Sequence, residues 1–69
     1  MNKITCYIKP DKINDAMFYI IDSMEGRITF FHNFDIFIQV NFEADSNGKD
    51  LSNFLNKEGV KNVYNIKIH

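Results

Sequence analysis

Residues 35–43 read Asp35-Ile36-Phe37-Ile38-Gln39-Val40-Asn41-Phe42-Glu43. Apolar side chains stand at every second position of this segment, and the positions between them carry Phe37, Gln39 and Asn41. Because successive side chains of a strand point to opposite faces, the alternation predicts a strand with one apolar face and one mixed face. This strand is the natural centre of a sheet, and the other segments are placed against it.

Three further segments have strand patterns, residues 3–9, 27–33 and 60–69, and each alternates between apolar and mixed positions. One side of every strand must face a core for the sheet to be stable. The residues expected on this inward side are Ile4, Cys6, Ile8, Ile28, Phe30, Ile36, Ile38, Val40, Phe42, Tyr64, Ile66 and Ile68.

Two segments have the spacing of amphipathic helices instead. In residues 12–25 the apolar side chains recur three or four positions apart, which gives one stripe along a helix. That stripe consists of Ile13, Ala16, Met17, Ile20, Ile21 and Met24. A shorter stripe follows at Leu51, Phe54 and Leu55. Both stripes are expected to cover the inward side of the sheet.

The resulting order is strand, helix, strand, strand, helix, strand, with no linker or repeat, so residues 1–69 are expected to form a single domain. Crossovers between parallel strands are almost always right-handed, which limits the possible topologies. The order therefore predicts an α+β, ferredoxin-like βαββαβ fold. Its four-stranded antiparallel sheet would have the strand order 4-1-3-2, with two helices on one face.

Composition limits the classes of partner and the location. The chain is 45% hydrophobic, with seven Phe and three Tyr, which is enough to build a core in 69 residues. Its net charge of -1 and its dispersed lysines argue against general binding to nucleic acids or anionic membranes. No stretch resembles a signal peptide or a membrane span. A cytoplasmic protein is therefore expected.

Residues that could perform chemistry are few. Cys6 is the only cysteine, which excludes an internal disulfide and a cysteine metal cluster, and its inward position is typical of a small buried hydrophobe. His32 falls in a predicted turn and His69 is the last residue of the predicted strand 60–69, so neither has a predictable partner. The segment 46–49, Ser-Asn-Gly-Lys, lacks the spacing of a phosphate loop. We expect no enzymatic activity, no metal and no cofactor.

The face of the sheet opposite the helices is the expected site of interaction. Aromatic side chains that gather on an exposed sheet face usually mark an interface. The candidate partner-binding residues on this face are Thr5, Tyr7, Thr29, Phe31, Phe37 and Gln39. Sheet-to-sheet homodimerisation and sparse exposure in a monomer are the simpler interpretations. The topology also suggests the RNA-recognition motif, but residues 33–40 lack its basic, glycine-containing octamer.

Three stretches are each followed by an element of the expected type: Ile4-Thr5-Cys6-Tyr7-Ile8-Lys9-Pro10, Phe42-Glu43-Ala44-Asp45 and Gly59-Val60-Lys61-Asn62-Val63. Together they resemble the NapD family of small cytoplasmic chaperones for the periplasmic nitrate reductase. That family binds the twin-arginine signal peptide of its client on the sheet side. The resemblance implies that the face around Tyr7, Phe31 and Phe37 receives such a peptide. The opening residues 3–10 also look like nitrogen-regulatory PII proteins, but the long nucleotide-sensing loop of those proteins is missing.

These observations favour a non-enzymatic protein- or peptide-binding module, with a signal-peptide chaperone as its most specific form. The alternatives are a homodimeric regulatory domain that senses a small ligand, and a small phage-type inhibitor that binds a host protein. Fold alone does not separate these functions.

Overall fold

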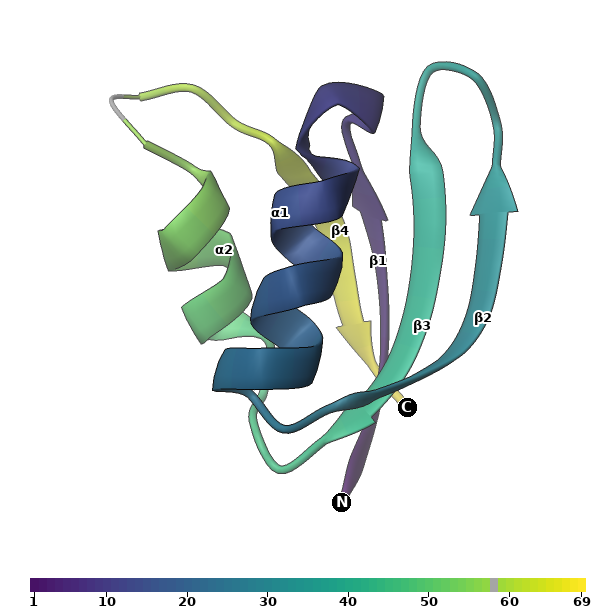
Figure 1. The fold of residues 1–69 in the computed structure, drawn as a ribbon, viewed down its shortest axis with the longest axis vertical. Coiled ribbons are helices and arrows are strands. Elements are labelled where there is room, and N and C mark those ends of the chain that lie inside the picture. Colours follow the sequence, from purple (N-terminus) through teal and green to yellow (C-terminus); the bar gives the residue numbers. More distant parts are fainter. Residues whose placement is uncertain (58) are drawn as a thin grey trace.

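The computed structural model describes residues 1–57 and 59–69 (Figure 1). The elements in chain order are β1 (Asn2–Ile8), η1 (Pro10–Lys12), α1 (Ile13–Phe18), η2 (Tyr19–Ser23), β2 (Arg27–Asn33), β3 (Ile38–Ala44), α2 (Lys49–Leu55) and β4 (Val63–Ile68). The short elements η1 and η2 are a 3-10 turn and a π-helical turn, which extend α1 at its two ends. The predicted α+β architecture, with four strands and two helices, is confirmed.

The four strands form one antiparallel sheet in the order β2-β3-β1-β4. Read from the opposite edge, this is the order 4-1-3-2, and it is compatible with a ferredoxin-like arrangement. The two central strands, β1 and β3, pair without interruption from Asn2 opposite Ala44 to Ile8 opposite Ile38. Their continuous register fixes which side chains of the sheet centre point to each face.

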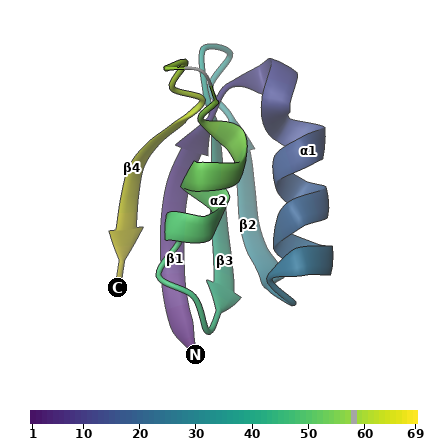
Figure 2. The ribbon, with the colours of Figure 1, turned by 90° about the vertical axis from the view of Figure 1, so that its left-hand side faces the viewer.

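The core lies between the sheet and the two helices, which cover the same face (Figures 1 and 2). Buried residues of β1 and β3 contact buried residues of both helices in one cluster. This cluster consists of Ile4, Cys6, Ile8, Ala16, Ile20, Ile38, Val40, Phe42, Ala44, Leu51, Leu55 and Val63. No helix of the described residues lies on the opposite face, which we call the open face.

The edge strand β2 contains an irregularity that reverses part of its predicted orientation. Its register against β3 shifts between Ile28 and Phe30, so that Phe30 lies opposite Asn41 and Phe31 lies opposite Val40. Val40 is buried under the helices, which places Phe31 on the helix side and Phe30 on the open face. The predicted orientations of Phe30 and Phe31 are therefore wrong, because one extra residue in a strand turns every following side chain over.

The other edge strand, β4, has a similar irregularity. Between the pairs Thr5–Lys67 and Tyr7–Tyr64, one residue of β1 faces two residues of β4, and Asn65 has a left-handed backbone with φ of 52°. Tyr64 therefore shares the open face with Tyr7, and its predicted inward orientation is wrong. The core position is taken instead by the preceding residue, Val63. β4 also begins three residues later than predicted, at Val63 instead of Val60.

The hairpin between β2 and β3 is longer than the alternation indicates. β3 begins at Ile38, whereas residues 34–37 form a turn in which the Phe34 N–H donates to the Phe37 carbonyl at 2.8 Å. Asp35 is left-handed in this turn, with φ of 70°. Ile36 is 73% exposed, so its predicted place in the core is wrong. The local turn chemistry of Asn and Asp outweighs the alternating pattern here.

Candidate functional site

Three aromatic residues meet at one end of the open face, and we call Tyr7, Phe37 and Tyr64 the aromatic cluster. Tyr7 and Tyr64 are register partners on β1 and β4. The Phe37 ring, just before β3, lies edge-on against Tyr64 with 5.0 Å between the centroids. Tyr64 is held further by Lys61, whose Nζ lies 5.2 Å from the ring centroid and whose carbonyl accepts from the Tyr64 hydroxyl at 2.8 Å. The cluster is thus a fixed apolar surface.

A cavity of about 300 Å³ adjoins the other end of the open face, and we call it the polar cavity after the hydroxyl, amide and imidazole groups in its walls. Its walls come from β1, β2, β3 and residue 69: Lys3, Ile4, Thr5, Thr29, Asn41, Phe42, Glu43 and His69. The Thr5 hydroxyl lies 2.8 Å from His69 Nε2, and the Thr29 hydroxyl donates to the Asn41 carbonyl at 3.3 Å. Hydroxyl, amide and imidazole groups in this arrangement suit hydrogen bonding to another polar chain.

Gln39 connects the aromatic cluster with the polar cavity. It lies opposite Tyr7 in the register of β1 and β3, and its Nε2 donates to Asn41 Oδ1 at 3.0 Å. Beside it, on β2, His32 lies between two phenylalanine rings, with centroids 6.4 Å from Phe30 and 4.4 Å from Phe34. The open face therefore presents aromatic groups at its margins and amides at its centre.

The charge of the open face differs in sign from that of the whole chain. Lys3 lies opposite Glu43 and Lys67 lies opposite Thr5, so both lysines are on this face. The Glu43 carboxylate on β3 forms an ion pair with Arg27, its register partner on β2. In the part of the chain that the structure describes, neither lysine has an ion-pair partner of its own. Although the net charge is -1, the open face is locally cationic.

The structure brings most of the predicted partner-binding residues together. Thr5, Tyr7, Phe37 and Gln39 lie on the open face as predicted, and Thr29 at the β2 irregularity lines the polar cavity. Phe31 lies on the other side of the sheet. The sequence interpretation missed Tyr64 and Phe30, which the two edge irregularities place on the open face. Asn65 was the available signal, since Asn tolerates the left-handed conformation that such a bulge requires.

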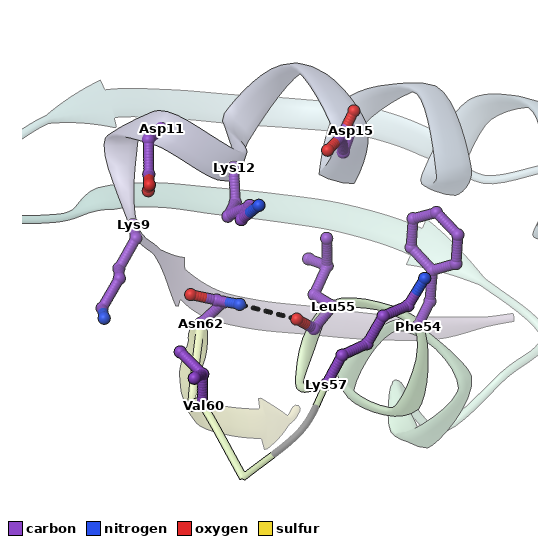
Figure 3. Close-up of a pocket in the computed structure, with 9 residues that line it drawn as sticks. All are labelled: Lys9, Asp11, Lys12, Asp15, Phe54, Leu55, Lys57, Val60 and Asn62. Atoms are coloured by element: carbon purple, nitrogen blue, oxygen red, sulfur yellow. Dashed lines mark hydrogen bonds between the residues drawn. The ribbon is translucent and has the colours of Figure 1, made fainter.

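A second cavity, of about 420 Å³, lies at the ends of the helices (Figure 3). We call it the helix-end cleft, and it is lined by Lys9, Asp11, Lys12, Asp15, Phe54, Leu55, Lys57, Val60 and Asn62. The Asn62 amide donates to the Leu55 carbonyl at 2.7 Å, and Lys57 Nζ lies 5.0 Å from the Phe54 centroid. Carboxylates and ammonium groups are mixed along its walls, so its charge selects neither an anion nor a cation.

Cys6 and the acidic and histidine side chains are the residues to consider for reactive or metal-binding chemistry. Cys6 is fully buried, and this burial raises the pKa of its thiol to about 12. A thiol with such a pKa stays protonated and unreactive near neutral pH. Among the residues that the structure describes, no three of His, Cys, Asp or Glu are grouped as metal ligands would be. No described helix has the length and apolar character needed to cross a membrane.

No protein-family model, curated protein or solved structure matches this chain. The side chains of the open face are therefore the basis on which a function is assigned.

Proposed function

We propose that the protein is a non-enzymatic protein- or peptide-binding module that receives a partner segment on its open face. The observation that supports this most strongly is the position of the aromatic cluster on the one sheet face without helices. The three side chains are half-buried, and aromatic anchors next to hydrogen-bonding groups are typical of the centres of protein interfaces. Tyr7, Phe37 and Tyr64 would anchor apolar side chains of the partner.

The hydrogen-bonding groups next to the cluster suit a polypeptide partner. Gln39 and Asn41 hold each other in place through their side-chain amides, and Thr29 lines the adjoining cavity, where the buried Thr5 holds His69. Such groups can donate to and accept from the peptide groups of an extended segment. The partner would therefore cross the face from the aromatic cluster to the polar cavity.

The charge of the face favours an acidic partner segment. Lys3 and Lys67 lie beside the proposed path, and Lys61 lies over the Tyr64 ring. Like charges brought together at an interface are unfavourable, whereas opposite charges increase association rates and specificity. A twin-arginine segment, as the resemblance to NapD implies, would add cations to this cationic face. A segment that combines aromatic or aliphatic side chains with Asp or Glu fits it better.

Single-stranded nucleic acid is a less suitable partner for the same face. Binding without sequence preference depends on aromatic rings whose flat faces are free to stack with bases. Here the Phe37 and Tyr64 rings meet at 62°, and the Lys61 ammonium lies over the Tyr64 ring. The two lysines of the face, Lys3 and Lys67, also do not form the continuous positively charged groove that follows a nucleic-acid backbone. The rings form a joint apolar surface instead of separate stacking platforms.

Selection from a random peptide display library tests the proposal directly. We expect enrichment of peptides that carry both apolar and acidic side chains, and we expect Phe37→Ser to weaken their binding by about 2 kcal/mol or more. The variant should stay folded, since a cross-strand aromatic pair contributes only about 1 kcal/mol or less. Phe18→Ser is the matched control, because Phe18 is an exposed phenylalanine on α1.

Three results would contradict the proposal. The first is that no peptide is enriched above background. The second is that the Phe37→Ser and Phe18→Ser variants bind the enriched peptides equally well. The third is salt-sensitive binding of single-stranded RNA in place of peptide binding, which would assign the open face to nucleic acid.

A further inference from the structure

The edge strand β2 is left exposed by the rest of the domain. In Figure 1 it lies at one margin of the sheet, outside the area that the two helices cover. Its two central phenylalanines, on opposite faces, have almost equal exposed fractions, 47% for Phe30 and 46% for Phe31. The following hairpin adds two more exposed apolar residues, Phe34 and Ile36. On its outer side β2 therefore has no neighbouring strand among the described residues of this chain, and its apolar side chains stay exposed on both faces of the sheet.

The outer edge of β2 also lacks most features that prevent strand pairing. Exposed edge strands are usually protected by Lys, Pro, inward charges or bulges. After its single register shift, β2 continues as Phe30-Phe31-His32-Asn33, with no Pro, Lys, Asp or Glu. The opposite edge is different, because β4 carries Lys67 and the left-handed Asn65. The unprotected part of this edge is thus residues 30–33.

We propose that β2 pairs antiparallel with β2 of a second copy of this chain, which joins the two four-stranded sheets into one. The pairing is centred on Phe31, which would lie opposite its own copy. Phe30 would then lie opposite His32 of the other copy, on the open face. Both pairings match side chains on the same face, as the sheet requires. Aromatic side chains that face each other across strands stabilise a sheet.

The sequence of β2 explains why a second copy is the occupant. A two-fold axis through the Phe31 pair makes the contact self-complementary and closed. No charged Asp, Glu, Lys or Arg side chain meets its own copy, because residues 30–33 contain none. The helices of both copies then lie on the same face of the joined sheet. The two Phe31 rings lie on that face too, between the two helix layers. Pairing of β2 with β4 of another copy would instead continue without limit as a fibre.

The mass of the untagged protein over a wide concentration range tests this dimer. Sedimentation or light scattering should show twice the mass of the chain as the concentration rises. Phe31→Lys should raise the dissociation constant about tenfold or more, because a lysine on an edge strand opposes pairing. The matched control is Ile68→Lys on the other edge, where Ile68 is 47% exposed and therefore tolerates the same charge equally well. This control should leave the dimer intact.

Cross-linking tests the position of the two-fold axis independently of affinity. Paired antiparallel residues have Cα atoms about 4.5–5.5 Å apart, a separation that a disulfide can span. Since Cys6 is buried, Phe31→Cys introduces the accessible thiol. Mild oxidation should convert this variant to a covalent dimer, whereas Ile68→Cys should react much more slowly. Circular dichroism confirms that each variant is folded.

The outcomes separate this proposal from the proposed function. Phe31 lies on the helix side, so Phe31→Lys should bind the selected peptides as the wild type does. A wild type that remains monomeric at all concentrations, or a dimer that Phe31→Lys does not weaken, would overturn the β2 contact. Equal effects of Phe31→Lys and Ile68→Lys would indicate a β2-to-β4 contact and would also overturn it. If Phe31→Lys no longer binds the selected peptides, β2 pairs with peptide instead of with a second copy, and the dimer proposal is overturned.

Discussion

Cys6 shows how far a single residue is determined by its place in the sheet. It lies on the central strand β1 opposite Val40, and its Sγ is 3.8 Å from the Val40 carbonyl oxygen. Its side chain is fully buried among apolar neighbours. Burial disfavours the thiolate, which is why the pKa of the thiol is raised from its ordinary value of 9.0 to about 12. Cys6 therefore acts as a core hydrophobe, and the raised pKa of its thiol makes the free energy of unfolding depend on pH.

The stability of the wild type should fall with rising pH through this titration. Between pH 9.0 and about 12 the unfolded chain loses the thiol proton while the folded chain keeps it. The unfolded state then binds fewer protons, so unfolding becomes more favourable by about 1.4 kcal/mol for each pH unit in this window. Urea denaturation of the wild type and of Cys6→Ala at neutral pH and at about pH 10.5 measures the difference. A constant difference between the two proteins would contradict the assignment.

At the scale of elements, the sequence predicts the centre of the sheet well and its edges poorly. In β1 and β3 the apolar residues stand strictly at alternate positions, so only one register buries them. In β2, Phe30 and Phe31 are adjacent, and either register buries one phenylalanine. In β4, Val63 and Tyr64 present the same choice. The pattern alone cannot decide in such cases, and a bulge decides instead.

The difference between central and edge strands also explains how much of the candidate site could be predicted from the sequence. Thr5, Tyr7 and Gln39 lie on the two central strands and were placed correctly, as was Phe37 beside them. Tyr64 lies beyond the bulge of β4, so its contribution to the aromatic cluster could not be derived from alternation. Any site that extends over edge strands is subject to this limit.

The β4 bulge gives a prediction for Asn65. Its φ of 52° is costly for a β-branched residue and free of strain for glycine. Asn65→Val should therefore lower the free energy of unfolding by about 1–2 kcal/mol, and Asn65→Gly should change it by less than about 0.5 kcal/mol. Thermal or chemical denaturation of the two variants provides the measurement. If the two substitutions have the same effect, β4 lacks the bulge and Tyr64 does not face outward as described.

At the scale of the whole molecule, the open face and the β2 edge are separate surfaces that could act together. The proposed two-fold axis places both helix layers on one side of the joined sheet. It therefore places both open faces, each with its own aromatic cluster, on the other side. A partner with two suitable segments would bind the dimer more tightly than the monomer by effective concentration alone. Disruption of the dimer should then weaken a bivalent partner and leave a single peptide unaffected.

The most direct test of the binding surface is an NMR titration of the isotope-labelled protein with a selected peptide. Binding to the open face predicts that the largest shifts occur at the backbone amides of Tyr7, Phe37 and Tyr64. The amides near Lys9 and Phe54, in the helix-end cleft, should change little. The largest shifts in that cleft, with the aromatic cluster unchanged, would contradict the assignment of the open face as the binding surface.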